Sequence, residues 1–172
     1  MTTATAVAVD YSNYRVNASN FAKEQEEVIE AAMNYPFAHV VERYSKEHDV
    51  PKEVALEHAR ELKRYLALSA LFPEKMYGMV GTVDKLWHTF IMFTQDYMDF
   101  CNKVNKRYIH HDPESLDADE TESNKTFESY HCFLEDYKVV FGEEPPVHIW
   151  PRPINYEEMA SQPQCIVRPP SF

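Results

Sequence analysis

Apolar side chains recur every three or four residues along most of the chain, which is the spacing of an amphipathic helix. The pattern predicts five helices, at about residues 21–35, 37–47, 51–71, 83–106 and 124–140. Runs of alternating β-branched residues do not occur, so a sheet is not expected. The sequence therefore predicts an all-α fold with a single domain.

Capping residues, proline and glycine mark the predicted helix ends. Asp49 and Pro51 are typical of a helix start, and Thr82 is a suitable N-cap for the helix that follows it. Residues 76–81 contain two of the three glycines and are predicted to form a connector. Phe141-Gly142 is expected to end the last helix.

The distribution of polar residues and prolines divides the chain into three parts. Residues 1–18 are small and polar and are expected to be loose, and residues 19–142 form the predicted helical domain. Residues 143–172 hold seven of the eleven prolines, with apolar residues between them, so we expect an extended segment packed on that domain. Six acidic residues between Asp112 and Glu122 predict a solvated loop.

Composition limits the partners and the compartment. A net charge of −11 argues against nucleic acid and against an anionic membrane surface. No apolar run approaches the length of a membrane span, and the first residues lack the basic region of a signal peptide. Three cysteines without a paired spacing are expected to be free thiols, which predicts a cytoplasmic protein and excludes a cysteine-rich zinc finger.

The candidate chemistry begins with Asp84 and His88. Four residues apart on a helix, these side chains lie on one face, one turn from each other. Asp84 also fits the ordinary role of an acidic residue at a helix N-terminus, and His88 that of a hydrogen-bonded histidine on an apolar face. Asp84 is either a metal ligand itself or a residue that orients the ring of His88.

A histidine pair after the same helix adds further ligands. His110 and His111 point in different directions if they lie in a loop, so one of them is enough to complete a site with Asp84 and His88. Two imidazoles and a carboxylate suit a divalent ion, with iron or zinc the first choices. A surface pair that caps the helix is the simpler alternative, and His131 joins only if its helix packs nearby.

The predicted length of the helix works against this site. His111 follows His88 by twenty-three residues, which is roughly 30 Å along a straight helix. The side chains can converge only if the chain folds back after about residue 106, or if the helix breaks early, for example near Asn102-Lys103.

Five motifs lie between about residues 60 and 150: Tyr65-Leu66-x-Leu68, Val83-Asp84-x-x-Trp87-His88, Tyr97, His111-Asp112-Pro113 and Tyr137-x-x-x-Phe141-Gly142. Together they resemble the motifs of the glycine-rich domain-containing protein-like family, particularly its short bacterial members. The resemblance implies that Asp84, His88 and His111 belong together, while His110 occupies a position where relatives often carry another residue. The glycine-rich region that names the family is missing, and the resemblance implies no particular reaction.

Two functional hypotheses follow. The first is a small mononuclear metalloenzyme acting on a small or peptide-like substrate, with iron activating oxygen or zinc polarising a water or a carbonyl. The second is a non-catalytic interaction module, in which the Asp/His cluster is structural and the acidic loop or the proline-rich tail contacts a protein partner. An open cavity beside His88 favours the first hypothesis, and a buried, fully bonded cluster favours the second.

Overall fold

A computed structural model describes residues 18–105, 107–113, 119–162 and 164–169, and it confirms a mostly helical single domain. The segment 1–17, predicted to be loose, and the centre of the acidic stretch lie outside the described residues. The described helices are α1 (Ala18–Met33), α2 (Ala38–His48), α3 (Lys52–Leu71), α4 (Val83–Met92), α5 (Thr94–Asn105), α6 (Glu120–Phe141) and α7 (Tyr156–Ala160).

The central element is α3, which packs against α1, α2, α4, α5 and α6. Its start differs from the sequence prediction, because Asp49 does not cap it. Asp49 instead ends α2 in a left-handed conformation with φ 51°, and the N-cap of α3 is Pro51, which offers no side-chain hydrogen bond. Aspartate tolerates the left-handed region, so a residue typical of helix starts serves here as a helix end.

The prediction of one continuous helix at residues 83–106 is wrong, because the segment divides at Phe93 into α4 and α5. Phe90 and Phe100 would lie about 15 Å apart along a straight helix. The bend brings their ring centroids to 5.4 Å, and it brings the rings of Phe90 and Tyr97 to 5.0 Å. Burial of these aromatic faces favours the break, which lies well before the position suggested by Asn102-Lys103.

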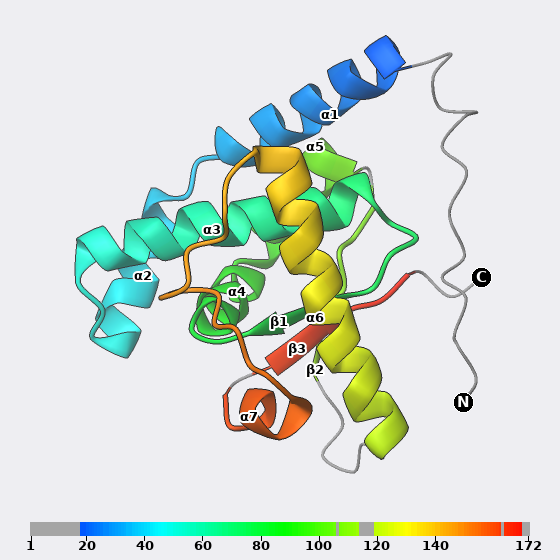
Figure 1. Cartoon of the computed structure of the whole chain (residues 1–172). Helices are drawn as coiled ribbons and strands as arrows, with labels where there is room; N and C mark the ends of the chain where they lie inside the picture. The colour runs from blue at the N-terminus through cyan, green and yellow to red at the C-terminus, as the bar shows by residue number, and fades with distance from the viewer. Residues whose placement is uncertain (1–17, 106, 114–118, 163, 170–172) are drawn as a thin grey trace.

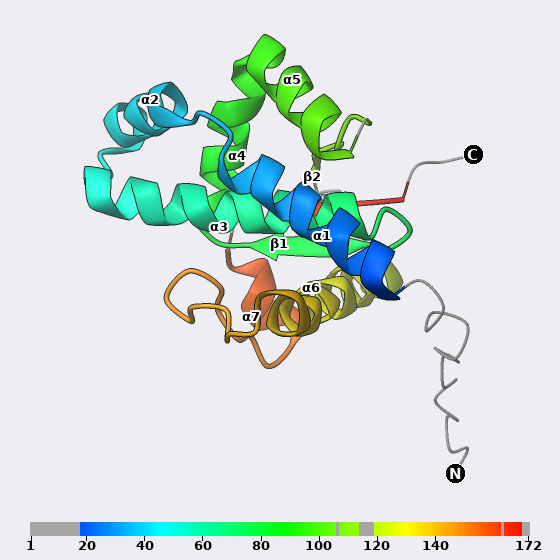
Figure 2. The ribbon, with the colours of Figure 1, turned by 90° about the horizontal axis from the view of Figure 1, so that it is seen from above.

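A small antiparallel sheet, which the sequence did not predict, lies among the helices. Its strands are β1 (Tyr77–Val80), β2 (Asp112–Pro113) and β3 (Gln164–Val167), in the order β1-β3-β2. The predicted connector at 76–81 is therefore mostly a strand. Figure 2 shows β1 between α3 on one side and α6 on the other. All four β1 residues are buried, so they lack the alternation by which a strand is usually recognised.

Gly78 allows α6 to approach β1 closely. A Cβ atom at this position would lie 2.8 Å from the carbonyl oxygen of Thr126 on α6. At the other end of α6, Gly142 adopts φ 68° and ends the helix, as the sequence predicts. Thr82 precedes α4, but its side chain makes no capping hydrogen bond.

A buried carboxylate on α3 holds the segment after α6 against the helical body. Glu61 of α3 is fully buried and accepts hydrogen bonds from the Trp150 indole N–H at 2.8 Å and the Tyr137 hydroxyl at 2.9 Å. Arg60 and Arg64 supply positive charge beside it, at 3.1 and 3.6 Å. This anchor holds the segment that contains Trp150 on α3. The rest of the tail includes the short helix α7, which departs from the predicted extended segment, and the central strand β3.

A chain of hydrogen bonds positions the segment after α5. The indole N–H of Trp87 donates to the Tyr97 hydroxyl at 3.1 Å, and this hydroxyl donates to the carbonyl oxygen of Ile109. The Ile109 N–H in turn donates to the thiol of Cys101 at 3.5 Å. Ile109 is thereby fixed to α5 and, through Tyr97, to Trp87 of α4, so the segment that leaves α5 folds back toward α4.

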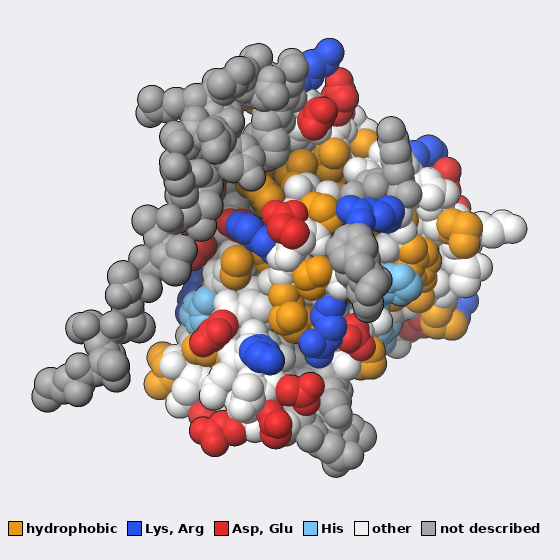
Figure 3. Space-filling model, turned by 90° about the vertical axis from the view of Figure 1, so that its right-hand side faces the viewer, with side chains coloured by type: hydrophobic (Ala, Val, Ile, Leu, Met, Phe, Trp, Pro, Cys, Tyr) orange, Lys and Arg blue, Asp and Glu red, His pale blue; other side chains and the backbone are white. Residues whose placement is uncertain are grey.

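Acidic and basic side chains are interspersed on the face drawn in Figure 3, with apolar side chains between them. Within the part of the chain that the structure describes, no helix combines the length and the hydrophobicity that crossing a bilayer requires.

Replacement of Glu61 tests the tail anchor. Glu61→Ala leaves the buried Trp150 and Tyr137 donors without their acceptor, so we expect the free energy of unfolding to fall by about 3–5 kcal/mol in urea denaturation. Glu57→Ala is the matched control on the same helix, because its carboxylate pairs with the exposed His148. Its effect should stay within about 0.5 kcal/mol, and equal losses in both variants would contradict the anchor.

Tyr97→Phe tests the hydrogen-bond chain. Loss of the hydroxyl leaves the Trp87 N–H and the Ile109 carbonyl unpaired in the core, and we expect a loss of about 1–3 kcal/mol in the free energy of unfolding. Tyr108→Phe serves as the control because Tyr108 is 43% exposed. If thermal or urea denaturation gives the same stability for both variants, the hydrogen bonds of Tyr97 do not contribute to the stability of the fold.

Candidate metal centre

Asp84 is the centre of a cluster formed by Asp84, His88, His111 and Cys165, which we call the Asp84 cluster. The residue Asp84 lies in the first turn of α4, and its side chain is only 5% exposed. Its Oδ1 lies 2.9 Å from Nε2 of His111, its Oδ2 lies 3.7 Å from Nε2 of His88, and the thiol of Cys165 is hydrogen-bonded to it. Both carboxylate oxygens therefore face nitrogen atoms of imidazole rings.

The pKa of Asp84 reflects these neighbours. Burial raises the pKa, but the hydrogen bonds from His111 and Cys165 and the charges of the two histidines lower it by more, so the net pKa lies below the usual aspartate value. Asp84 is therefore an ionised carboxylate in a buried position, which requires compensation by donors or by a cation.

His111 reaches the cluster because of the break at Phe93 and the fixed position of Ile109. Its side chain is 8% exposed, and its ring packs against Trp87 and His88 with centroid distances of 4.6 and 4.4 Å. A straight helix would separate His88 from His111 by roughly 30 Å. This separation does not arise, because α4 ends shortly after His88 and the chain folds back.

Cys165 is the member of the cluster that the sequence analysis missed. It lies on β3, is fully buried, and has a pKa well above the usual thiol value because of burial first and the Asp84 charge second. Its Sγ, a carboxylate oxygen of Asp84 and a ring nitrogen of His111 lie within 4.8 Å of one another. Nothing in the spacing from Asp84 to Cys165 indicates this contact, because it depends on β3 pairing between β1 and β2.

His88 forms the outer edge of the cluster. It follows Asp84 by one helical turn, as predicted, and its side chain is 55% exposed. The ring is therefore the part of the cluster that meets solvent. The donor atoms that lie within 4.8 Å of one another belong to Asp84, His111 and Cys165, so His88 can join them as a ligand only if its ring moves toward them.

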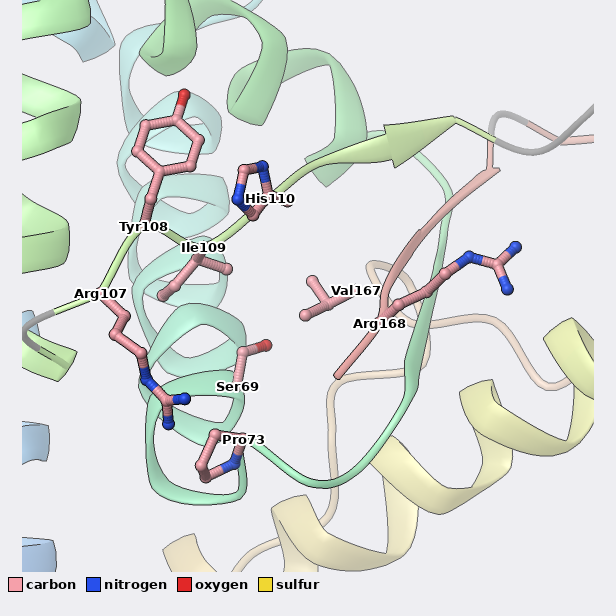
Figure 4. A pocket seen from close by; sticks show the side chains of 8 residues that line it. All are labelled: Ser69, Pro73, Arg107, Tyr108, Ile109, His110, Val167 and Arg168. Atoms are coloured by element: carbon pink, nitrogen blue, oxygen red, sulfur yellow. The ribbon is translucent and has the colours of Figure 1, made fainter. Parts of the chain in front are cut away.

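His110 lies apart from these four residues. It is exposed, and its ring packs 4.9 Å from that of Tyr108. Figure 4 shows it at the rim of a small pocket of about 50 Å³, into which Ile109 and Val167 point from opposite sides. Adjacent residues in extended backbone point in opposite directions, which is why only His111 meets Asp84.

His131, the remaining candidate, lies on α6, where its ring packs 4.6 Å from that of Phe127. The two cysteines outside the cluster have other partners: Cys101 accepts the hydrogen bond from Ile109, and Cys132 lies 3.9 Å from Asp136. All three cysteines are free thiols, as the sequence predicts. A carboxylate, a thiol and two imidazoles are together a donor set that fits a transition-metal ion, and they equally satisfy one another by hydrogen bonds.

No curated protein and no solved structure matches this chain. A family model does match it, and the match overturns the resemblance to the glycine-rich domain-containing protein-like family that the Asp-x-x-Trp-His motif suggested. The motif lies within the matched region, so short patterns of this kind are shared more widely than that family. The match covers residues 24–137, well over half of the chain, and the protein therefore belongs to the UCP032817-like family.

Proposed function

We propose that this protein binds one zinc ion at the Asp84 cluster and works as a non-catalytic interaction module. In this module the ion has four protein ligands and a structural role. The ligands would be a carboxylate oxygen of Asp84, one ring nitrogen each from His88 and His111, and the Cys165 thiolate. A reducing compartment such as the cytoplasm would keep this thiol available.

The observation that carries the proposal is the convergence of three donor atoms from Asp84, His111 and Cys165 within 4.8 Å. In a tetrahedral zinc site with bonds of about 2.0–2.3 Å, two ligand atoms lie about 3.3–3.8 Å apart. The 3.7 Å distance from Oδ2 of Asp84 to Nε2 of His88 falls in this range, and the 2.9 Å distance from Oδ1 to Nε2 of His111 requires a small expansion. Because the two distances involve different oxygens, coordination by a single oxygen also requires a rotation of the carboxylate.

The donor set favours zinc over the iron that two histidines and a carboxylate alone would equally suit. A thiolate is a soft ligand that zinc binds readily, alone or together with imidazole and carboxylate. Binding would also replace the proton of the buried thiol with a cation, which balances the charge of Asp84.

Burial favours a closed site over a catalytic one. The two hollows described on the surface are lined by other residues, and none of the four cluster residues lines either of them. Structural zinc sites use four protein ligands, whereas catalytic sites keep a position open for water or substrate. The arrangement thus supports the interaction module more than the metalloenzyme.

The metalloenzyme remains a second candidate because His88 is half exposed. If His88 stays outside the coordination sphere, the ion has three protein ligands and a fourth position that faces solvent. Water or a carbonyl of a small or peptide-like substrate would then be polarised there.

Metal content tests the site itself. Protein produced without a histidine tag and dialysed against zinc should contain about one ion per chain by plasma mass spectrometry. After further dialysis against metal-free buffer the wild type should keep this ion. His111→Ala and Cys165→Ser should lose most of it under the same conditions, because each has lost one buried ligand and binds zinc more weakly, although serine keeps a hydrogen-bonding group beside Asp84. His110→Ala is the matched control and should keep it. Retention of the ion by both site variants would refute the proposal.

Azide binding to the cobalt-substituted protein distinguishes the closed site from the catalytic one. A site with four protein ligands has no position for azide, so the visible spectrum of the wild type should not change. His88→Ala opens one position, and its spectrum should shift. A shift of the same size in the wild type would show that His88 is not a ligand and would favour the metalloenzyme.

A further inference from the structure

We propose that occupancy of the Asp84 cluster by the ion controls the docking of the C-terminal strand β3, so that the metal acts as a latch on this strand. The inference rests on the proposed metal site and adds a regulatory role to it. Asp84 and His88 lie on α4 and His111 immediately precedes β2, whereas Cys165 is the sole cluster residue contributed by the C-terminal segment.

The position of β3 makes its docking consequential. It is the central strand, paired on one side with the whole of β1 and on the other with β2. Departure of β3 would separate β1 from β2 and leave both without the neighbour that joins them. Cys165, Ile166 and Val167, which are buried in the docked strand, would be exposed.

Apart from its pairing with β1 and the burial of its apolar side chains, the attachments of β3 outside the cluster are limited. The strand has four residues, and its partner β2 has two, one of which is Pro113, which has no N–H to donate. Arg168 pairs with Asp112 at 2.7 Å, but both side chains are about half exposed, and surface ion pairs contribute little. Gln164 buries its side-chain oxygen without a partner among the described residues, which opposes docking.

The chain before β3 is held independently of the ion. Trp150 is bound to Glu61, and the Tyr130 hydroxyl donates to the carbonyl oxygen of Pro151 at 2.8 Å. An opening that releases Cys165 can therefore be confined to the segment that follows this anchor. A ligand that binds only the docked state suppresses such an opening by the factor 1 + [ligand]/Kd.

Hydrogen exchange of the full chain tests the latch, with zinc buffered at one hundred times its Kd or removed by a chelator. Amides of β3 should exchange about 100-fold more slowly with zinc. Amides of α2, which carries no cluster residue, should change far less. An equal change in both elements would show that the ion stabilises the whole fold, and an unchanged β3 in zinc-loaded protein would refute the latch.

Two variants separate the latch from metal binding as such, with zinc readjusted to one hundred times the Kd of each. Cys165→Ser leaves three ligands but removes the one on β3, so exchange of β3 should no longer respond to zinc. His88→Ala also leaves three ligands, including Cys165, and β3 should still respond about 100-fold. The same response in both variants contradicts the latch, whereas failure of the wild type to bind zinc contradicts the metal site on which it rests.

Discussion

The ionised carboxylate of Asp84, buried at the start of α4, is the constraint around which this part of the molecule is organised. A buried charge without partners is strongly unfavourable, and Asp84 obtains its partners from its own helix and from two segments that are distant in sequence. Satisfying this one group therefore requires the return of the chain after α5 and the docking of β3. The cluster links secondary structure to tertiary fold through a single side chain.

Two further polar arrangements make that convergence possible. The hydrogen bonds from Trp87 through Tyr97 to Ile109 direct His111 toward α4, and the Glu61 anchor brings the tail close enough for β3 to enter the sheet. Each uses a polar group inside an aromatic core, where lost partners are costly. The site is thus supported by the core, with His88 as its contact with solvent.

The sequence predicted five helical segments and three of the four cluster residues, and the most secure part of this prediction depends on local spacing. Asp84 and His88 are one helical turn apart, and this relation holds whatever the rest of the chain does. The break at Phe93 could not be predicted in the same way, since it depends on the packing of Phe90 against Phe100. Cys165 was missed for a similar reason: strands of two to four residues have no readable periodicity, and only the pairing of β3 with β1 and β2 brings its thiol to Asp84.

X-ray absorption at the zinc edge tests the central claim most directly, because it reports the atoms bound to the ion. For zinc-loaded wild-type protein we expect a first shell with one sulfur at about 2.3 Å and nitrogen or oxygen neighbours at about 2.0–2.2 Å. Cys165→Ser should lose the sulfur, while Cys132→Ser should keep it. A first shell of nitrogen and oxygen alone in the wild type would show that Cys165 does not bind the ion and would contradict the account.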